Sequence, residues 1–293
     1  MRTISLLPAT RSQFVLAGAT GAIALGAVLA MGRIVPPADL LFPTVVCGSL
    51  AVVAARFRSR GEEGFVLCLK ALILLVGFSA AFAMLTYVLA LSDRPWADAR
   101  LAAIDAAAGL SAGDVVAWTT SHPAVEMFLK IVYFSLIPQT IVAIILLGFA
   151  ADRRLDLFLV RFMLAALLTA VCFAFWPARG SCVQFGLPTP PHYEGVLREL
   201  YALRAGVRAV TWRGAEGIVT FPSFHAIWAA LLTAAFWRHR FFWPMAALNL
   251  LVLISCITTG MHYFIDVAAG LVITAVVIVA TRGLCPTSAV DGT

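Results

Sequence analysis

Charged side chains are scarce in this chain. Asp, Glu, Lys and Arg together make up 12% of its 293 residues, whereas hydrophobic residues make up 62% and the mean hydropathy is +0.96. A soluble globular domain usually carries about 25% charged residues, roughly twice this share. The composition therefore excludes an ordinary water-soluble domain and predicts an integral membrane protein.

Cysteines and basic runs are also few. The six cysteines show no CxxC spacing, and most lie within apolar runs, where cysteine acts as a small hydrophobic residue. We therefore expect no metal site and no cofactor, and a disulfide between Cys182 and Cys256 stays open. No basic run is interleaved with aromatic residues, so the net charge of +6 does not indicate a nucleic-acid partner.

Apolar runs long enough to cross a bilayer repeat along the chain. About 20 apolar residues span ~30 Å of hydrocarbon, so these runs predict an all-α, polytopic bundle of about eight transmembrane helices. The first run follows Arg2 and Arg11 and also fits a signal peptide, but its length favours a retained helix. The runs cover residues 13–31, 38–55, 65–91, 123–150, 156–177, 222–237, 241–259 and 262–281.

Arginines gather in alternate connections between these runs, which predicts an orientation. By the positive-inside rule, these connections and both termini are cytoplasmic. The expected location is a bacterial inner (plasma) membrane, with the opposite connections facing the periplasm. The arginines of the expected cytoplasmic side are Arg56, Arg58, Arg60, Arg153, Arg154, Arg238, Arg240 and Arg282.

Two of the outer connections are too long for simple turns. Residues 92–122 place Leu101, Ile104 and Ala108 at helical spacing between charges. This pattern fits an amphipathic helix at the membrane interface or a plain solvated connector. Residues 178–221 are rich in proline, glycine and arginine, and long loops of this kind often carry function.

Three titratable residues border the outer face at the ends of apolar helices. His262 and Asp266 are four residues apart, so they share one face of a helix, and the carboxylate can accept a proton from one imidazole nitrogen. The other nitrogen can then attack an electrophile or take up a proton. His225 follows Pro222 by three residues, with Ser223 as the predicted N-cap. Two helix N-termini that each bear a histidine suit a phosphate group.

The segments FPSFHA and GMHYFIDVAAG resemble the second and third signature motifs of the type 2 phosphatidic acid phosphatase superfamily. The resemblance is closest to its inositolphosphotransferase-like branch, which is similar to inositol phosphorylceramide synthase. It covers about residues 95–281, and the patterns LAAIDAAAG, YFSLIPQ, FWPARG, LRAG and EGIVTFPSFH support it. It implies a catalytic core of the six-helix type within the bundle.

The resemblance also implies phosphoryl transfer through a covalent phosphohistidine. His262 would attack phosphorus, Asp266 would orient and polarise it, and His225 would protonate the leaving oxygen. Ser223, Phe224 and neighbouring backbone N–H groups would hold the phosphate oxygens. Phosphoryl transfer needs mainly positioning and charge stabilisation, which agrees with the pattern of residues.

Three positions depart from the usual motifs of the superfamily. Cys256 stands where the third motif has its phosphate-binding arginine, and Phe224 replaces a glycine of the second. Ile137 replaces the arginine of the first motif, which otherwise survives only in Lys130 and Pro138. These differences favour the inositolphosphotransferase-like branch over an ordinary lipid phosphatase.

Another cation must then neutralise the phosphate, because a dianion in a partly dehydrated site needs more than neutral donors. Arg204 and Arg179 are favoured, because they lie in the outer loop or at its edge. Lys130 also has an ion-pair interpretation, because Glu126 precedes it by one helical turn. The candidate cations are Arg204, Arg179, Arg208, Arg213 and Lys130.

The sequence thus predicts a membrane phosphatase or phosphotransferase that acts on lipid phosphate or phospho-headgroup esters at the outer face. Its expected partners are a lipid-phosphate substrate and membrane lipids, and the oligomeric state stays open. A transporter that couples protons or ions through His and Asp is the alternative, but it should carry polar groups near the bilayer midplane. A purely structural protein is a third interpretation, although it has no need for the buried carboxylate of Asp266.

The expected division of the chain follows from these features. Residues 1–92 hold N-terminal transmembrane helices, and residues 93–122 form an outer amphipathic segment. Residues 123–282 hold the catalytic core with its outer loop 178–221, and residues 283–293 form a cytoplasmic tail.

Overall fold

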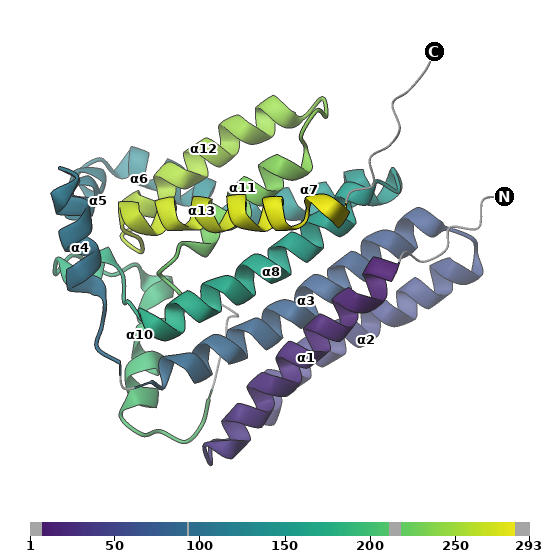
Figure 1. Cartoon of the computed structure of the whole chain (residues 1–293), viewed down its shortest axis with the longest axis horizontal. Coiled ribbons are helices and arrows are strands. Elements are labelled where there is room, and N and C mark those ends of the chain that lie inside the picture. Colours follow the sequence, from purple (N-terminus) through teal and green to yellow (C-terminus); the bar gives the residue numbers. More distant parts are fainter. Residues whose placement is uncertain (1–7, 93, 211–217, 285–293) are drawn as a thin grey trace.

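A computed structural model describes residues 8–92, 94–210 and 218–284 of the chain. Within these ranges the regular elements are helices, and one isolated bridge joins Ile34 to Ala209. The all-α, polytopic bundle expected from the sequence is therefore confirmed (Figure 1). The helices are α1 (Pro8–Ala30), α2 (Pro37–Ser59), α3 (Glu63–Ala90), α4 (Asp98–Ala107), α5 (Ala112–Thr120), α6 (Pro123–Phe134), α7 (Leu136–Phe149), α8 (Arg153–Phe175), α9 (Ser181–Gln184), α10 (Pro191–Arg204), α11 (Phe224–Ala235), α12 (Phe242–Thr258), α13 (Phe264–Ala280) and the 3-10 helix η1 (Arg282–Leu284).

Five helical segments are long and apolar enough to cross a membrane. They are α1, α2, α3, the pair α6 and α7, and α8. The pair counts as one span that is interrupted at Ser135, three residues before Pro138, whose ring removes a backbone donor. The chain is therefore a multi-pass integral membrane protein.

The last three apolar helices are shorter than the sequence pattern suggests. α11 has 12 residues, and α12 and α13 have 17 each. At 1.5 Å per residue α11 is about 18 Å long, less than the ~30 Å thickness of the hydrocarbon. The non-helical residues before it include Ile218, Val219 and Thr220, which are buried. α11 therefore begins inside the bundle, and its histidine lies below the surface.

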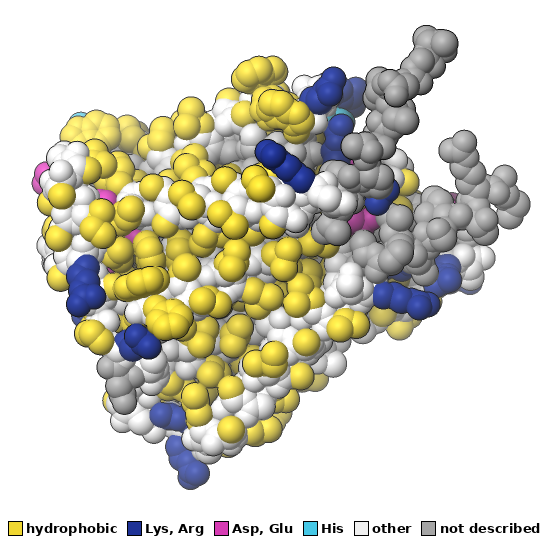
Figure 2. Space-filling model, viewed as in Figure 1, with side chains coloured by type: hydrophobic (Ala, Val, Ile, Leu, Met, Phe, Trp, Pro, Cys, Tyr) yellow, Lys and Arg dark blue, Asp and Glu magenta, His cyan; other side chains and the backbone are white. Residues whose placement is uncertain are grey.

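The two ends of the bundle carry different connections. Figure 1 places the α2–α3, α7–α8 and α11–α12 connections at one end, together with the end of α13, and places α4, α5 and α10 at the other. The connections with the expected cytoplasmic arginines therefore lie together. Lys and Arg side chains gather at both ends, and hydrophobic side chains cover the middle (Figure 2). We call the end that carries α4, α5 and α10 the site end.

The outer segment 93–122 forms neither a single amphipathic helix nor a plain connector. It contains α4 and α5, whose axes meet at 93°. Leu101 is buried as expected, but Ile104 is 49% exposed, and the buried face of α4 carries Asp98 and Asp105 instead. The spacings of three and four residues place these two carboxylates on the face of Leu101, and this face packs against α13.

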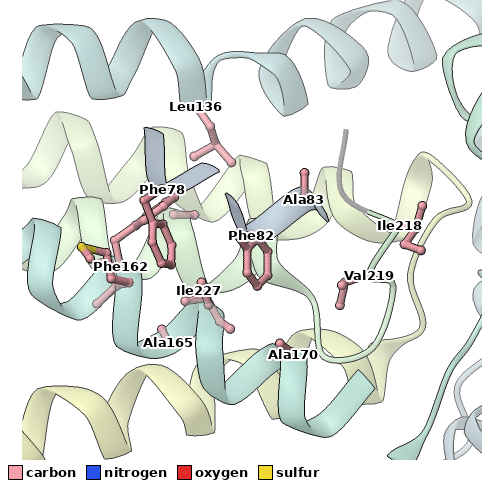
Figure 3. Close-up of a cluster of buried hydrophobic side chains, with 14 of the residues drawn as sticks. Phe78, Phe82, Ala83, Leu136, Phe162, Ala165, Ala170, Ile218, Val219 and Ile227 are labelled. Carbon is pink, nitrogen blue, oxygen red and sulfur yellow. The ribbon is translucent and has the colours of Figure 1, made fainter. Parts of the chain in front are cut away.

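The hydrophobic core lies between α3, α8 and α11. Phe78 and Phe82 of α3 lie near Phe162 of α8 and Ile227 of α11 (Figure 3). The rings of Phe78 and Phe162 meet edge to face with centroids 6.4 Å apart, an arrangement that aromatic pairs favour. α1 and α2 pack against α3, and α11 packs against α8. The core thus holds the helix that carries His225 in place.

Candidate active site

The segment before α11 is hydrogen-bonded to the first turn of α13. The hydroxyl of Ser223 caps α11 by accepting a hydrogen bond from the backbone N–H of Ala226 (3.3 Å), as the sequence predicts. The backbone N–H of Ser223 donates to the carbonyl oxygen of Asp266 (3.0 Å). Gly270 permits this approach, because a Cβ atom there would lie 2.7 Å from the carbonyl oxygen of Ser223. Backbone contacts therefore join the two histidine motifs.

His262 lies just before α13 and is 1% exposed. Its Nδ1 atom lies 2.8 Å from the carbonyl oxygen of Thr220 and 3.5 Å from Oδ2 of Asp266. A carbonyl oxygen only accepts hydrogen bonds, so in the neutral imidazole the proton belongs on Nδ1 and the lone pair on Nε2. Nε2 is buried and has no hydrogen-bond partner among the described residues. Asp266 therefore shares the Nδ1 proton with Thr220 instead of accepting it alone.

His225 faces His262 from the first turn of α11. The centroids of the two imidazole rings are 6.0 Å apart. The His225 ring stacks on Tyr133 of α6 with centroids 4.1 Å apart, and the Tyr133 hydroxyl lies 3.0 Å from Nδ1 of His225. His225 is half-buried, whereas Tyr133 is buried. The tyrosine thus sets the orientation of the imidazole and engages one of its two nitrogens.

Carboxylates occupy the first turn of α13. Oδ2 of Asp266 accepts a hydrogen bond from the backbone N–H of Tyr263 (2.9 Å). Asp105 of α4 accepts hydrogen bonds from the backbone N–H groups of Phe264 (2.8 Å) and Ile265 (2.9 Å). The free N–H groups that the sequence suggests at this helix terminus are therefore already used, and an anion cannot bind to them without displacing a carboxylate.

Asp98 connects α4 to the FWPARG segment and to the residue after His262. Its carboxylate accepts hydrogen bonds from the backbone N–H groups of Arg179 and Gly180 and from the hydroxyl of Tyr263, each at 3.0 Å. Burial, with the Asp98 carboxylate beside it, raises the pKa of Tyr263, so the phenol stays protonated and donates. A buried carboxylate with this many donors is a structural anchor for the residues around the histidines.

Arg204 and Arg179, the two favoured cations, both lie over the ring of Trp96. The Arg204 guanidinium donates to the carbonyl oxygen of Ala90 (2.9 Å) and lies 3.4 Å from the centroid of the Trp96 ring. The Arg179 guanidinium lies 5.3 Å from the same centroid, and its Nε is 3.3 Å from Oδ2 of Asp98. Both side chains therefore make contacts within the protein, and their role toward phosphate stays a prediction.

The other candidate cations have different surroundings. Nζ of Lys130 lies 2.5 Å from Oε1 of Glu126, so the expected i to i+4 ion pair is present. Lys130 is also about one turn before Tyr133 on α6. Arg208 is exposed, and Arg213 lies outside the described residues.

Phe224 and Cys256, which depart from the motifs of the superfamily, have clear positions. The Phe224 side chain packs into the core, with its ring centroid 5.6 Å from that of Phe82 and 5.0 Å from that of Phe162. Its backbone N–H, which donates to no described residue, is the part that can serve a ligand. Cys256 is buried beside Ser223 as a free thiol, so it brings no charge to the site.

The free thiols settle one question that the sequence leaves open. Cys182 and Cys256 are both free, so they do not form a disulfide. Among the described residues, no three His, Cys, Asp or Glu side chains are grouped as a metal site would need.

Four residues of this site are not singled out by the sequence. Asp105 and Tyr133 lie within the supporting patterns LAAIDAAAG and YFSLIPQ, where a polar group in an apolar stretch is the available signal. Asp98 resembles any acidic residue at a helix start. Thr220 acts through its backbone carbonyl, which leaves no trace in the sequence.

Residues 99–280 match the model of the PAP2 superfamily, the type 2 phosphatidic acid phosphatases that the two histidine motifs resemble. No curated protein and no solved structure matches the chain. The family match begins in α4 and ends with α13, so it includes His225, His262 and Asp266. Because it covers more than half of the chain, the protein belongs to the PAP2 superfamily, which implies an activity of the phosphatase or phosphotransferase type.

Proposed function

We propose that this protein cleaves or transfers phosphate esters of membrane lipids, with His262 as the nucleophile. One observation carries the proposal. The Nε2 atom of His262 is buried and has no hydrogen-bond partner among the described residues, while Nδ1 is held by the Thr220 carbonyl and Asp266. A buried histidine with a purely structural role normally pairs both of its nitrogens. The open lone pair is instead suited to attack.

In the first step, Nε2 of His262 forms a bond to phosphorus, and the bond between phosphorus and the leaving oxygen breaks. His225 gives a proton to that oxygen, since its ring lies 6.0 Å from the His262 ring, a separation that leaves room for phosphorus and its leaving oxygen. The positive charge that develops on His262 is stabilised by the nearby Asp266 carboxylate. Substrate approaches from the side of His225, because His225 is half-buried and His262 is closed.

In the second step, an oxygen nucleophile attacks the phosphorus and gives its proton to His225. The bond between Nε2 of His262 and phosphorus breaks, and the lone pair returns to the nitrogen. The Tyr133 hydroxyl can accept a hydrogen bond from Nδ1 of His225 or donate one to it, so this contact persists in both protonation states. Water as the nucleophile gives hydrolysis, and an alcohol gives transfer.

The phosphate oxygens would be held near the start of α11. The backbone N–H of Phe224 points from the first turn of this helix, where the dipole favours an anion. The capping hydroxyl of Ser223 lies beside it. Arg204, Arg179, Arg213 and Lys130 remain the proposed sources of positive charge.

The orientation and the branch of the family belong to the same proposal. The arginine-bearing connections lie together at the end opposite the histidines, which supports an active site at the outer face. Cys256 and Phe224, in place of a motif arginine and glycine, support the inositolphosphotransferase-like branch.

The proposal is tested by measuring phosphate release and transfer from labelled phosphatidic acid and from a ³²P-labelled total lipid extract. His262→Ala and Asp266→Asn should lose activity by at least ~100-fold and stay folded in detergent. His122→Ala is the matched control, because His122 is an exposed histidine in the same membrane half, before α6. Full activity of the His262→Ala variant would show that His262 is not the nucleophile.

A further inference from the structure

A pocket with basic and aromatic walls opens at the site end, apart from the histidine pair. It has a volume of about 240 Å³ and lies between the start of α4 and the end of α8. Arg94 and Arg100 line it together with the rings of Trp96, Phe175 and Trp176. Phe175 and Trp176 are 52% and 47% exposed. Aromatic and arginine side chains together are typical of the level at which lipid headgroups meet the hydrocarbon.

The two arginines of this pocket are not paired with a carboxylate of any described residue. Arg94 and Arg100 are both exposed. The Arg94 guanidinium lies 4.9 Å from the centroid of the Phe175 ring, a contact that orients the side chain and leaves its donors open. Two guanidinium groups beside one small pocket favour an anion with several oxygens, such as a phosphate.

A second cavity lies close to the first, at the ends of α3 and α8. It has a volume of about 340 Å³ and is lined mainly by apolar side chains, among them Val88, Leu89 and Leu91 at the end of α3. Arg33 and Ser92 also line it. On α8 it is lined by Ala174, the residue before Phe175 of the basic pocket. Along the chain, its lining residues at the ends of α3 and α8 precede those of the basic pocket, and both helices run toward the site end (Figure 1). A basic pocket next to a mainly apolar cavity suits a lipid, whose headgroup is polar and whose acyl chains are apolar.

We infer that these two cavities bind one anionic phospholipid, with its phosphate at Arg94 and Arg100 and part of an acyl chain beside Ala174. Charge complementarity accounts for the headgroup, and the apolar cavity accounts for a lipid in place of free phosphate. The site lies near the candidate active site, because the Trp176 ring lies 6.3 Å from that of Phe221, two residues before Ser223. The inference stands without the proposed chemistry, since it concerns binding alone.

Native mass spectrometry of the detergent-purified full chain tests this site. The probes are dioleoyl phosphatidylglycerol, dioleoyl phosphatidylcholine with the same chains, and inorganic phosphate. The headgroup variant is Arg94→Gln with Arg100→Gln, and the chain variant is Ala174→Leu, which fills the apolar cavity. The matched control is Arg58→Gln with Arg60→Gln, two exposed arginines at the opposite end.

The headgroup variant should bind phosphatidylglycerol roughly tenfold less than wild type, with phosphatidylcholine unaffected. The chain variant should also bind less phosphatidylglycerol than wild type. This second variant keeps the test valid if the headgroup variant does not fold. Phosphatidylglycerol binding by both variants at the level of the control overturns the inference. Displacement of the lipid by inorganic phosphate, with normal binding by Ala174→Leu, contradicts a lipid site and identifies a site for free phosphate.

Discussion

Asp105 of α4 lies across the start of α13, with its Oδ2 atom 2.8 Å from the backbone nitrogen of Phe264. The other carboxylate oxygen accepts from the N–H of Ile265 at 2.9 Å. A helix of the outer segment thus supplies the N-terminal cap of the helix that carries Asp266. The position of His262 therefore depends on a residue 157 positions earlier in the chain, and the outer segment is part of the site.

Asp105→Ala should lower the thermal stability and the activity together. The change leaves two backbone donors without their charged acceptor, which costs about 1–3 kcal/mol. Asp105→Asn keeps one acceptor oxygen, so its melting temperature and activity should lie between those of wild type and of Asp105→Ala. The check is the melting temperature in detergent, with Asp114→Asn as the control, because Asp114 is an exposed residue of the neighbouring α5. Equal melting temperatures for Asp105→Ala and the control would contradict the capping role.

Tyr133→Phe should reduce kcat by roughly three- to tenfold with KM nearly unchanged. The variant keeps the stacked ring but loses the hydroxyl 3.0 Å from Nδ1 of His225, a contact worth about 0.5–1.5 kcal/mol. Steady-state kinetics measure the separation of kcat from KM.

Trp228→Phe is the control for Tyr133→Phe. It removes a comparable hydrogen bond from α11, that between Nε1 of Trp228 and Oγ1 of Thr140 (2.8 Å), without touching His225. A similar loss of kcat in both variants would show that Tyr133 acts only through general stability.

Gly270→Ala should destabilise the protein by about 1–3 kcal/mol and lower its activity. The new Cβ would meet the carbonyl oxygen of Ser223 at 2.7 Å, so α13 and the start of α11 must separate. Gly48→Ala is the matched control, because Gly48 also lies in a helix but has open space around its Cβ position. Thermal unfolding should show a lower stability for Gly270→Ala but not for Gly48→Ala. Equal stability losses in both variants would mean that the close approach of α13 to Ser223 does not need glycine.

The five cysteines that the structure describes should be found as thiols in the folded protein. Burial raises the pKa of Cys182, so its thiolate is scarce near neutral pH and alkylation of the folded chain should be slow. Alkylation should accelerate as the pH rises above the usual range for cysteine or after unfolding. Mass spectrometry without reducing agent measures both, and a Cys182–Cys256 crosslink would contradict the structure.

Much of the fold is predictable from the sequence, because composition and hydrophobic run length report directly on the bilayer. His225, His262 and Asp266 stand out for the same reason, as titratable groups at the ends of apolar runs. The start of α11 inside the bundle is not predictable in this way. The sequence places residues 178–221 in the outer loop, yet Ile218, Val219 and Thr220 at its end are buried.

The supporting contacts depend on tertiary structure, and the sequence does not contain their signal. Asp98 and Asp105 look like solvated charges of an amphipathic helix, yet they turn inward because Tyr263, Phe264 and Ile265 supply donors that satisfy them. The sequence also does not show which arginine contacts which residue. Arginines in a loop are equivalent in the sequence, and only the fold shows that Arg204 lies on Trp96.

The most direct test of the central claim is to locate the phosphoryl group on the protein. Purified protein is mixed with the ³²P-labelled total lipid extract, quenched rapidly in alkali and digested for mass spectrometry. We expect a label that is stable to alkali and labile to acid, attached to His262 and absent from His262→Ala. Turnover of labelled lipid with the label on another residue, or with an equally labelled His262→Ala variant, would contradict the account.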